Sequence, residues 1–316
     1  MLIVSLCYSF LAERIIESNT FACGLSSLAA HLSTTAILDG NIDLKTKNHS
    51  NDEHGSGIWI IASYINHSCL GNCCRTFIGD MQIVRATQDM VADTELEFSY
   101  ISSFAPNADF DSRQKKLRKQ WDFTCLCILC MDAKTADKKL IAKRKAFEKD
   151  LTRAFEAADS KSGLNVSKLD TAKVERTLAA LEKSHKDTLG KIPRKEMWEP
   201  YLALTRVYNM LGNHTKVLWG VSKTLEMLAF KVKGIMSSHE PLIVDKWGMV
   251  VDHLIECWLL LWTCFAHQGK GEKAAAAKNN AVVTFRIVVG EDESFDETYG
   301  SKAELYIAQG RTWNGL

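Results

Sequence analysis

The stretch Ile65-Asn66-His67-Ser68-Cys69 decides how the rest of this 316-residue chain is interpreted. Two further short motifs follow it in order, Glu95-Leu96-Glu97-Phe98-Ser99-Tyr100 and Cys125-Leu126-Cys127-Ile128-Leu129-Cys130. Taken alone, the neighbouring His67 and Cys69 suggest a nucleophile and its base. Residues this close in sequence seldom face each other correctly, and catalytic pairs usually lie far apart in the chain, so we reject that interpretation.

The third motif predicts a metal site. Cys125, Cys127 and Cys130 place three thiols within one turn of chain, and zinc prefers four tetrahedral ligands with cysteine thiolate among the favoured ones. A fourth ligand must therefore come from elsewhere, and Cys69, Cys73 and Cys74 are all candidates. A redox interpretation of Cys127 and Cys130 lacks the βαβ surroundings that such motifs usually have.

The composition narrows the compartment and the partners. Ten cysteines in a chain of this length, without a convincing secretory signal, indicate reduced thiols rather than a disulfide framework. We therefore expect the nucleus, the cytoplasm or both. A net charge of +1 creates no global field that selects nucleic acid or membrane, and no apolar run reaches the roughly 18–20 residues of a membrane span.

Patterning along the chain predicts two kinds of structure. Residues 1–38 look helical or mixed, the polar segment 39–57 resembles an exposed insertion loop, and residues 58–104 look mainly β. In this β part, the run 58–65 and residues 95–100 read as strand, and residues 74–86 as a hairpin turning at Gly79-Asp80.

From Ala133 onward the pattern is helical, broken by glycine and proline. Gly212, Gly269 and Gly310 mark similar helix–turn–helix corners, but their spacings do not match the period of about 34 residues of a tetratricopeptide repeat. We therefore predict an irregular, repeat-like array of helices. The predicted helices are Ala133–Ala158, Ser167–Ser184, Glu196–Leu211, His214–Val232, Pro241–His267, Glu272–Val288 and Ser294–Gln309.

In their order, the three motifs resemble the second half of a SET domain, the fold of protein lysine methyltransferases, followed by its cysteine-rich post-SET element. The nearest pattern is that of the SET-and-MYND (SMYD) type and its fungal SET–tetratricopeptide relatives. Glu17-Ser18-Asn19-Thr20-Phe21, Gly55-Ser56-Gly57-Ile58-Trp59 and the segment from Arg113 to Phe123 resemble further family segments. The resemblance covers residues 17–130 well and residues 131–316 only in architecture.

The resemblance implies an α+β chain of three parts. Residues 1–104 would form the C-terminal part of a SET domain, residues 105–132 the post-SET helix and zinc element, and residues 133–316 an all-α, tetratricopeptide-like domain. Nothing before Glu17 resembles the family's Gly-rich strand pair, and a MYND finger is missing, so we expect a truncated enzyme or one that no longer binds cofactor.

The resemblance also implies a role for each motif residue. The Asn66 strand and the Tyr100 strand would cross and build one side of an S-adenosylmethionine pocket. The implied roles are Asn66, His67, Phe123, Asn19 and Ser63 on the cofactor, Tyr100 at the reacting methyl group, Trp121 in the lysine channel, and Cys69 with Cys125, Cys127 and Cys130 on zinc.

Three functions follow from these features. The first is a SET-type transferase that methylates a lysine of a histone or another protein. The second is an inactive SET remnant whose helical array binds proteins. The third, a stand-alone zinc-binding structural protein, leaves Asn66, His67 and Tyr100 unexplained. The basic residues 113–119 lack interleaved aromatic residues, so we interpret them as a solvated helix face and expect no direct nucleic-acid binding.

Overall fold

The computed structural model describes residues 13, 15–23, 27–38, 55–101, 109–158, 165–185 and 188–314. Our predictions for residues 1–12, for the insertion loop at residues 39–54 and for residues 102–104 therefore lie outside the described residues. Among the described helices, none combines the length and the apolar character that crossing a membrane requires.

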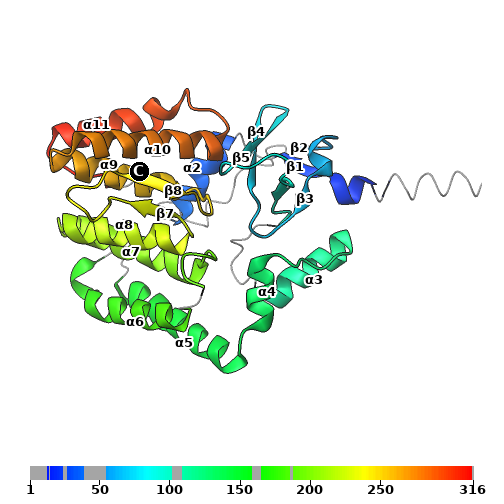
Figure 1. Ribbon diagram of the computed structural model, residues 1–316, viewed down its shortest axis with the longest axis horizontal. Helices are drawn as coiled ribbons and strands as arrows, with labels where there is room; N and C mark the ends of the chain where they lie inside the picture. The colour runs from blue at the N-terminus through cyan, green and yellow to red at the C-terminus, as the bar shows by residue number, and fades with distance from the viewer. Residues whose placement is uncertain are drawn as a thin grey trace, which may run out of the picture.

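The first part of the chain forms three small two-stranded sheets, and a 12-residue helix follows the first strand (Figure 1). The first sheet pairs two antiparallel strands, the second two parallel strands, and the third is an antiparallel hairpin. In order, these sheets are β1 (Phe21–Cys23) with β2 (Gly55–Gly57), β3 (Asn66–His67) with β6 (Glu97–Phe98), and β4 (Cys73–Ile78) with β5 (Met81–Ala86). The helix is α2 (Ser27–Leu38).

Two expectations for this part need correction. The predicted insertion loop ended at residue 57, but β2 already occupies residues 55–57 and pairs with β1. The apolar run 58–65, which we read as a strand, instead contains a 3-10 turn at Ala62–Tyr64. Ile60 and Ile61 are 72% and 84% exposed, so the middle of the run lacks the packed neighbours that stabilise a strand. The hairpin turning at Gly79-Asp80 is confirmed.

Helix α3 (Phe110–Trp121) carries the basic cluster expected on a solvated face. The Asp109 side chain caps it by accepting the Ser112 N–H. Gln114 and Leu117 are its buried residues, while Lys115, Lys116, Arg118 and Lys119 are exposed. The cysteine motif follows and leads into α4 (Ile128–Thr135).

From residue 138 the chain forms an array of helices, and each helix before α10 packs against the next one in sequence. The last helix, α11, packs on α9. A continuous apolar core runs through it, with Leu178, Trp258 and Phe285 fully buried. The helices are α5 (Lys138–Ala158), α6 (Thr171–Ser184), α7 (Lys195–Met210), α8 (His214–Met227), α9 (Leu254–His267), α10 (Gly271–Val289) and α11 (Ser301–Ala308), with a short 3-10 turn at Val166–Lys168 and a π-helical turn at Asp296–Gly300.

The expectation of an all-α C-terminal domain is wrong at one place. Two antiparallel strands, β7 (Lys231–Lys233) and β8 (Ile243–Lys246), form a hairpin between α8 and α9. The predicted helix Pro241–His267 therefore begins only at Leu254. Ile243 and Val244 are β-branched and find a strand partner in Lys231–Lys233, so pairing overrides the helical reading there.

The three glycine corners share one geometry. Gly212, Gly269 and Gly310 have φ of +66°, +68° and +69°. At each corner the N–H of the following residue donates to the carbonyl five positions back, for example Lys270 N–H to Phe265 O at 2.9 Å. This is the bonding of a Schellman cap, which favours glycine because φ is positive. The similarity of these corners read from the sequence thus reflects a common helix ending.

The described chain follows an arc whose ends meet (Figure 1). It runs from the small sheets through α3 and α4, along α5 and α6, and back through the remaining helices until α10 contacts β4 and α2. At this closing contact the Arg85 guanidinium donates to the Gly290 carbonyl at 2.6 Å. His31 of α2 bridges Asp252 (2.7 Å) and the Tyr299 hydroxyl (2.6 Å) of the helical array.

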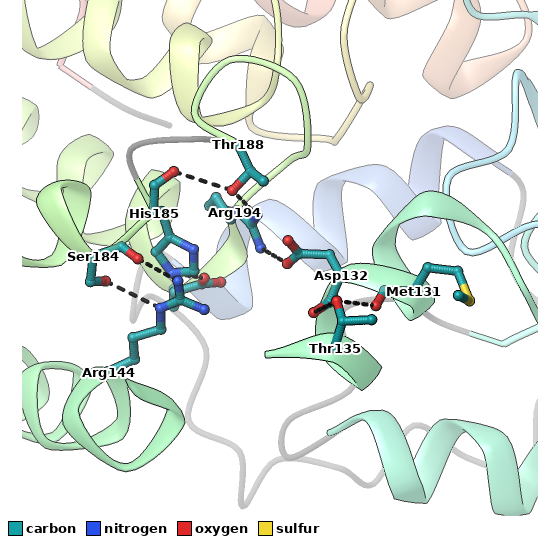
Figure 2. Close-up of polar contacts among 9 residues, drawn as sticks. Met131, Asp132, Thr135, Arg144, Ser184, His185, Thr188 and Arg194 are labelled. Carbon is teal, nitrogen blue, oxygen red and sulfur yellow. Dashed lines mark hydrogen bonds and ion pairs between the residues drawn. The ribbon is translucent and has the colours of Figure 1, made fainter. Parts of the chain in front are cut away.

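A second junction joins the cysteine element to the array (Figure 2). Arg194, 4% exposed, pairs with Asp132 of α4 at 2.7 Å and also donates to Thr188. Beside it, Arg144 of α5 donates to Ser184 at the end of α6. The buried guanidinium thus fixes α4 against the start of α7.

Candidate active site

The site is built where the segment after His67 lies directly against β6. A Cβ atom added to Gly71 would lie 2.5 Å from the Glu97 carbonyl oxygen and 2.6 Å from the Phe98 Cα, so only glycine fits this approach. Asn72 fastens the contact with both ends of its amide. Its Nδ2 donates to the Glu95 carbonyl at 2.8 Å, and its Oδ1 accepts the Glu97 N–H at 2.9 Å. The first two motifs therefore lie side by side.

His67 connects this contact to the cysteines. Its Nδ1 accepts the Tyr100 N–H at 2.9 Å, so the neutral ring carries its proton on Nε2, which lies 3.4 Å from the Cys69 sulfur. The ring is buried and both its nitrogens are engaged within the chain.

The backbone of His67 faces the other way. Ser68 donates its N–H to the Phe98 carbonyl at 3.3 Å, and His67 is the residue opposite Phe98 in this parallel pair. In such a pair, the N–H and C=O of His67 point away from β6. Within the described part of the chain β3 pairs only with β6. The His67 N–H and C=O therefore lie along an edge that no described strand covers.

Four cysteine sulfurs meet at the second part of the site. Those of Cys69, Cys125, Cys127 and Cys130 all lie within 4.8 Å of one another, with Cys69 3.6 Å from Cys130 and 3.9 Å from Cys125. A tetrahedron with metal–sulfur bonds of about 2.3 Å has edges of about 3.7 Å, which agrees with these separations. Of the three candidates for the fourth position, the structure brings Cys69 into the cluster and leaves out Cys73 and Cys74.

Hydrogen bonds among the four thiols shift their pKa values in opposite directions. Hydrogen bonds, first from Cys125, then from Cys127 and Cys130, raise the pKa of the Cys69 thiol, whereas bonds from Cys127, Cys130 and Cys69 lower the pKa of Cys125. The protein alone therefore does not ionise all four groups together. A divalent metal that demands four thiolates suits this donor set, because coordination removes the remaining protons.

Gln114 holds the cysteine loop in place, and sequence reasoning missed it. Its Nε2 donates to the Cys125 carbonyl and its Oε1 accepts the Cys125 N–H, both at 3.1 Å. The side chain is 4% exposed on α3. A glutamine in a charged helix carries no local signal for such a role.

Aromatic rings gather around Tyr100. The ring of Trp121 lies 5.1 Å from that of Tyr100, and the ring of Phe123 lies 6.3 Å from Tyr100 and 5.7 Å from His67. The Tyr100 hydroxyl donates to the Ile65 carbonyl at 2.7 Å. Burial raises the pKa of Tyr100, so the phenol is neutral and can donate a hydrogen bond at neutral pH.

The side chains of the remaining predicted residues all form hydrogen bonds within the chain. Asn66 is exposed and its Nδ2 donates to Glu95 Oε1 at 2.7 Å. Asn19 donates to the Ile15 carbonyl at 3.0 Å, and the Ser63 hydroxyl to the Trp59 carbonyl at 3.0 Å. The indole N–H of Trp121 donates to the Ser18 carbonyl at 3.0 Å, which puts Asn19 one residue from the aromatic group.

A cation beside the aromatic group was also missed. The Arg75 guanidinium lies 5.1 Å from the ring centre of Phe21 and 4.9 Å from that of Phe98. The ring of Phe98 in turn lies 5.7 Å from that of Tyr100. Phe21 stood in a segment that the sequence had singled out, but a single arginine in a predicted hairpin gave no signal.

Comparison with known proteins identifies similar sequences. Residues 8–101 match the SET domain family. A protein named methyltransferase from Gibberella zeae is 33% identical over 303 residues, which span 93% of this chain and 39% of that protein. The human histone-lysine N-methyltransferase SMYD3 is 35% identical over 78 residues, 25% of this chain and 18% of that enzyme. The human N-lysine methyltransferase SMYD2 is 36% identical over 91 residues, 29% of this chain and 20% of that enzyme.

The matches agree with the motif order. This chain spans about two fifths of the Gibberella protein and smaller shares of the others. Residues 8–101 match the SET domain, and parts of the chain are similar to lysine methyltransferases of the SMYD type.

Proposed function

We propose that this protein is an S-adenosylmethionine-dependent protein-lysine N-methyltransferase. One observation carries the proposal: the neutral Tyr100 phenol lies among three rings, those of Trp121, His67 and Phe123, whose centres are 5.1, 5.2 and 6.3 Å from its own. A methyl transfer needs such a place, because catalysis here consists mainly of aligning two substrates in a dry site.

Cofactor binding would use the groups on the outer edge of β3. The His67 N–H and C=O offer one donor and one acceptor, and Phe123, whose ring lies 5.7 Å from the His67 ring, offers an aromatic face; such groups suit a purine ring. Asn66 keeps its amide oxygen to accept, because only its Nδ2 is taken by Glu95. Asn19 and Ser63 are further proposed contacts. When bound, S-adenosylmethionine supplies an electrophilic methyl group on a sulfonium.

The substrate amine would enter beside the paired rings of Tyr100 and Trp121. The ammonium first gives its proton to water, because only the free lone pair can attack. The nitrogen–carbon bond then forms as the carbon–sulfur bond breaks, and the bonding electrons stay on sulfur. The positive charge thereby passes to the methylated nitrogen. Tyr100 would orient the amine through its hydroxyl, which already donates to the Ile65 carbonyl.

Zinc would be held by Cys69, Cys125, Cys127 and Cys130 as a structural ion. It would join the motif after β3 to the start of α4 and so keep Trp121 and Phe123 over the site. The His67 Nε2–H, 3.4 Å from the Cys69 sulfur, would stabilise the thiolate. Zinc binding requires reduced thiols, so we propose that the protein acts in the nucleus or cytoplasm. We further propose that its substrate is a protein, histone or other.

One observation favours a second function, that of an inactive SET module that binds proteins through its helical array. The amides of Asn66 and Asn19 are both engaged within the chain. This rival predicts the same zinc content but no transfer of methyl groups.

The test incubates the zinc-loaded full chain with methyl-labelled S-adenosylmethionine and a mixture of core histones. Methyl-lysine is then measured after acid hydrolysis. Tyr100→Phe should lower the rate by about 10²-fold, because it removes the group that orients the amine. Tyr306→Phe, a matched change in α11, should leave the rate unchanged. No methyl-lysine from a folded, zinc-loaded chain would favour the rival.

A further inference from the structure

Arg75 places a positive charge at the edge of the proposed active site. It lies on β4, opposite Val84 of β5, and its guanidinium contacts the rings of Phe21 and Phe98 at 5.1 and 4.9 Å. Cation–π contacts from two rings hold the charge in one position. Phe98 also contacts Tyr100, so the cation stands one ring away from the phenol.

This charge has no counter-ion in the part of the chain that the structure describes: there, no carboxylate forms an ion pair with Arg75. Its neighbour Cys74 is no anion, because burial raises the pKa of that thiol to about 12. Burial lowers the pKa of Arg75 itself, but an arginine keeps its charge in proteins.

The other titratable groups nearby do not cancel the charge. His67 on β3 faces Tyr100 with Nδ1, which accepts the Tyr100 N–H. Glu97 on β6 is influenced by burial and by Glu95, Cys125, Cys127 and His67 rather than by Arg75. Arg75 does act on Tyr100, since its positive charge opposes the rise in the pKa of Tyr100 that burial causes.

We propose that Arg75 favours the uncharged form of the lysine amine beside Tyr100 and thereby sets the pH range in which the amine can accept a methyl group. This inference rests on the proposed function. A fixed cation in a dry aromatic site disfavours a second cation, and the incoming lysine must lose its proton before attack. The same repulsion favours release of the methylated, charged product.

The first test measures the potential at Tyr100 without cofactor or substrate. The zinc-loaded full chain is produced with 3-fluorotyrosine, and the Tyr100 fluorine resonance is identified by its loss in Tyr100→Phe. Arg75→Met, which can still fill the space between the two rings, should raise the ionisation midpoint at Tyr100 by about half a pH unit or more. Arg75→Lys should retain most of the effect, and Arg153→Gln, a change of one exposed charge on α5, should have none.

Unchanged midpoints in Arg75→Met, with zinc content and circular dichroism intact, would overturn the inference. Should Arg75→Met fail to fold, Arg75→Gln provides the same comparison with a polar side chain.

The second test measures methyl transfer to core histones against pH. Removing the Arg75 charge should shift the acid side of the kcat/KM profile upward by about the same half unit. A normal rate with an unshifted profile would contradict the inference. A chain that transfers no methyl group would count against the proposed function, whereas an unmoved Tyr100 midpoint would count against Arg75 alone.

Discussion

The region of the site and the helical array are stabilised in different ways. The array buries a continuous core in which Trp258, Phe265 and Phe285 are essentially inaccessible to solvent. Around the site, the main buried cluster contains five residues, and three of them are the cysteines Cys69, Cys125 and Cys130. Apolar burial can hold the array, whereas we propose that a metal bound by these cysteines cross-links the site region.

The difference separates stability from function within one chain. The proposed catalytic groups lie on short strands and loops. These segments make few apolar contacts, so they can adjust locally when a substrate binds. The array closes the arc through α10 and holds α4 through Arg194. Changes in the two regions should therefore produce different losses.

Metal removal should produce the largest loss. Chelation, or Cys127→Ser, should release one zinc per chain and expose residues 109–135 to hydrogen exchange, while α6–α10 stay protected. Structural zinc contributes on the order of 10 kcal/mol in small zinc domains, more than any single side chain here. Mass spectrometry of exchange and metal analysis measure both effects. Cys73→Ser, a buried cysteine outside the cluster, is the matched control and should keep its zinc.

Breaking the junction between the two regions should cost somewhat less. Asp132→Ala leaves the Arg194 guanidinium buried without its carboxylate and should lower the free energy of unfolding by about 4 kcal/mol. Asp150→Ala, which removes an exposed pair with Arg153, should cost at most about 0.5 kcal/mol. Urea denaturation compares them. Equal losses in the two variants would mean that the junction does not connect the regions.

A core change in the array should destabilise without touching the site. Leu178 of α6 is 0% exposed, and Leu178→Ala should cost about 3 kcal/mol through lost burial and the cavity left behind. Zinc content should stay at one per chain. Loss of zinc in this variant would show that the two regions do not behave separately.

The smallest expected change is the loss of folding free energy at acid pH through His253. Burial lowers the pKa of His253 in the folded array to about 4, while its unfolded value is near 6.5. The unfolded chain therefore binds the proton first, and stability falls as the pH drops from about 6.5 toward 4. Between pH 7 and pH 4.5 the loss from this group should be about 2 kcal/mol. His253→Gln should lose less stability over that interval than the parent chain, and identical slopes would contradict this assignment.

The sequence predicted the parts whose signals are local or whose motif order is distinctive. The hairpin around Gly79-Asp80 and a helix carrying the basic residues 113–119 follow from turn chemistry and from the charge pattern. The convergence of Tyr100, Trp121 and Phe123 came from motif order, since no local pattern brings these rings together.

What it did not predict depends on distant partners. The β7–β8 hairpin forms because Ile243 and Val244 meet Lys231–Lys233, and a helical pattern in one segment cannot reveal that partner. Gln114 and Arg75 acquire their roles only when the Cys125 loop and two phenylalanine rings are brought against them.

We propose that the region around His67 and Tyr100, held together by zinc, binds S-adenosylmethionine. Titration calorimetry of the folded, zinc-loaded full chain tests it directly. We expect saturable binding with one cofactor per chain. Cys127→Ser should lose that binding, and Cys73→Ser should retain it. A folded chain with one zinc and no detectable heat of binding would contradict the claim.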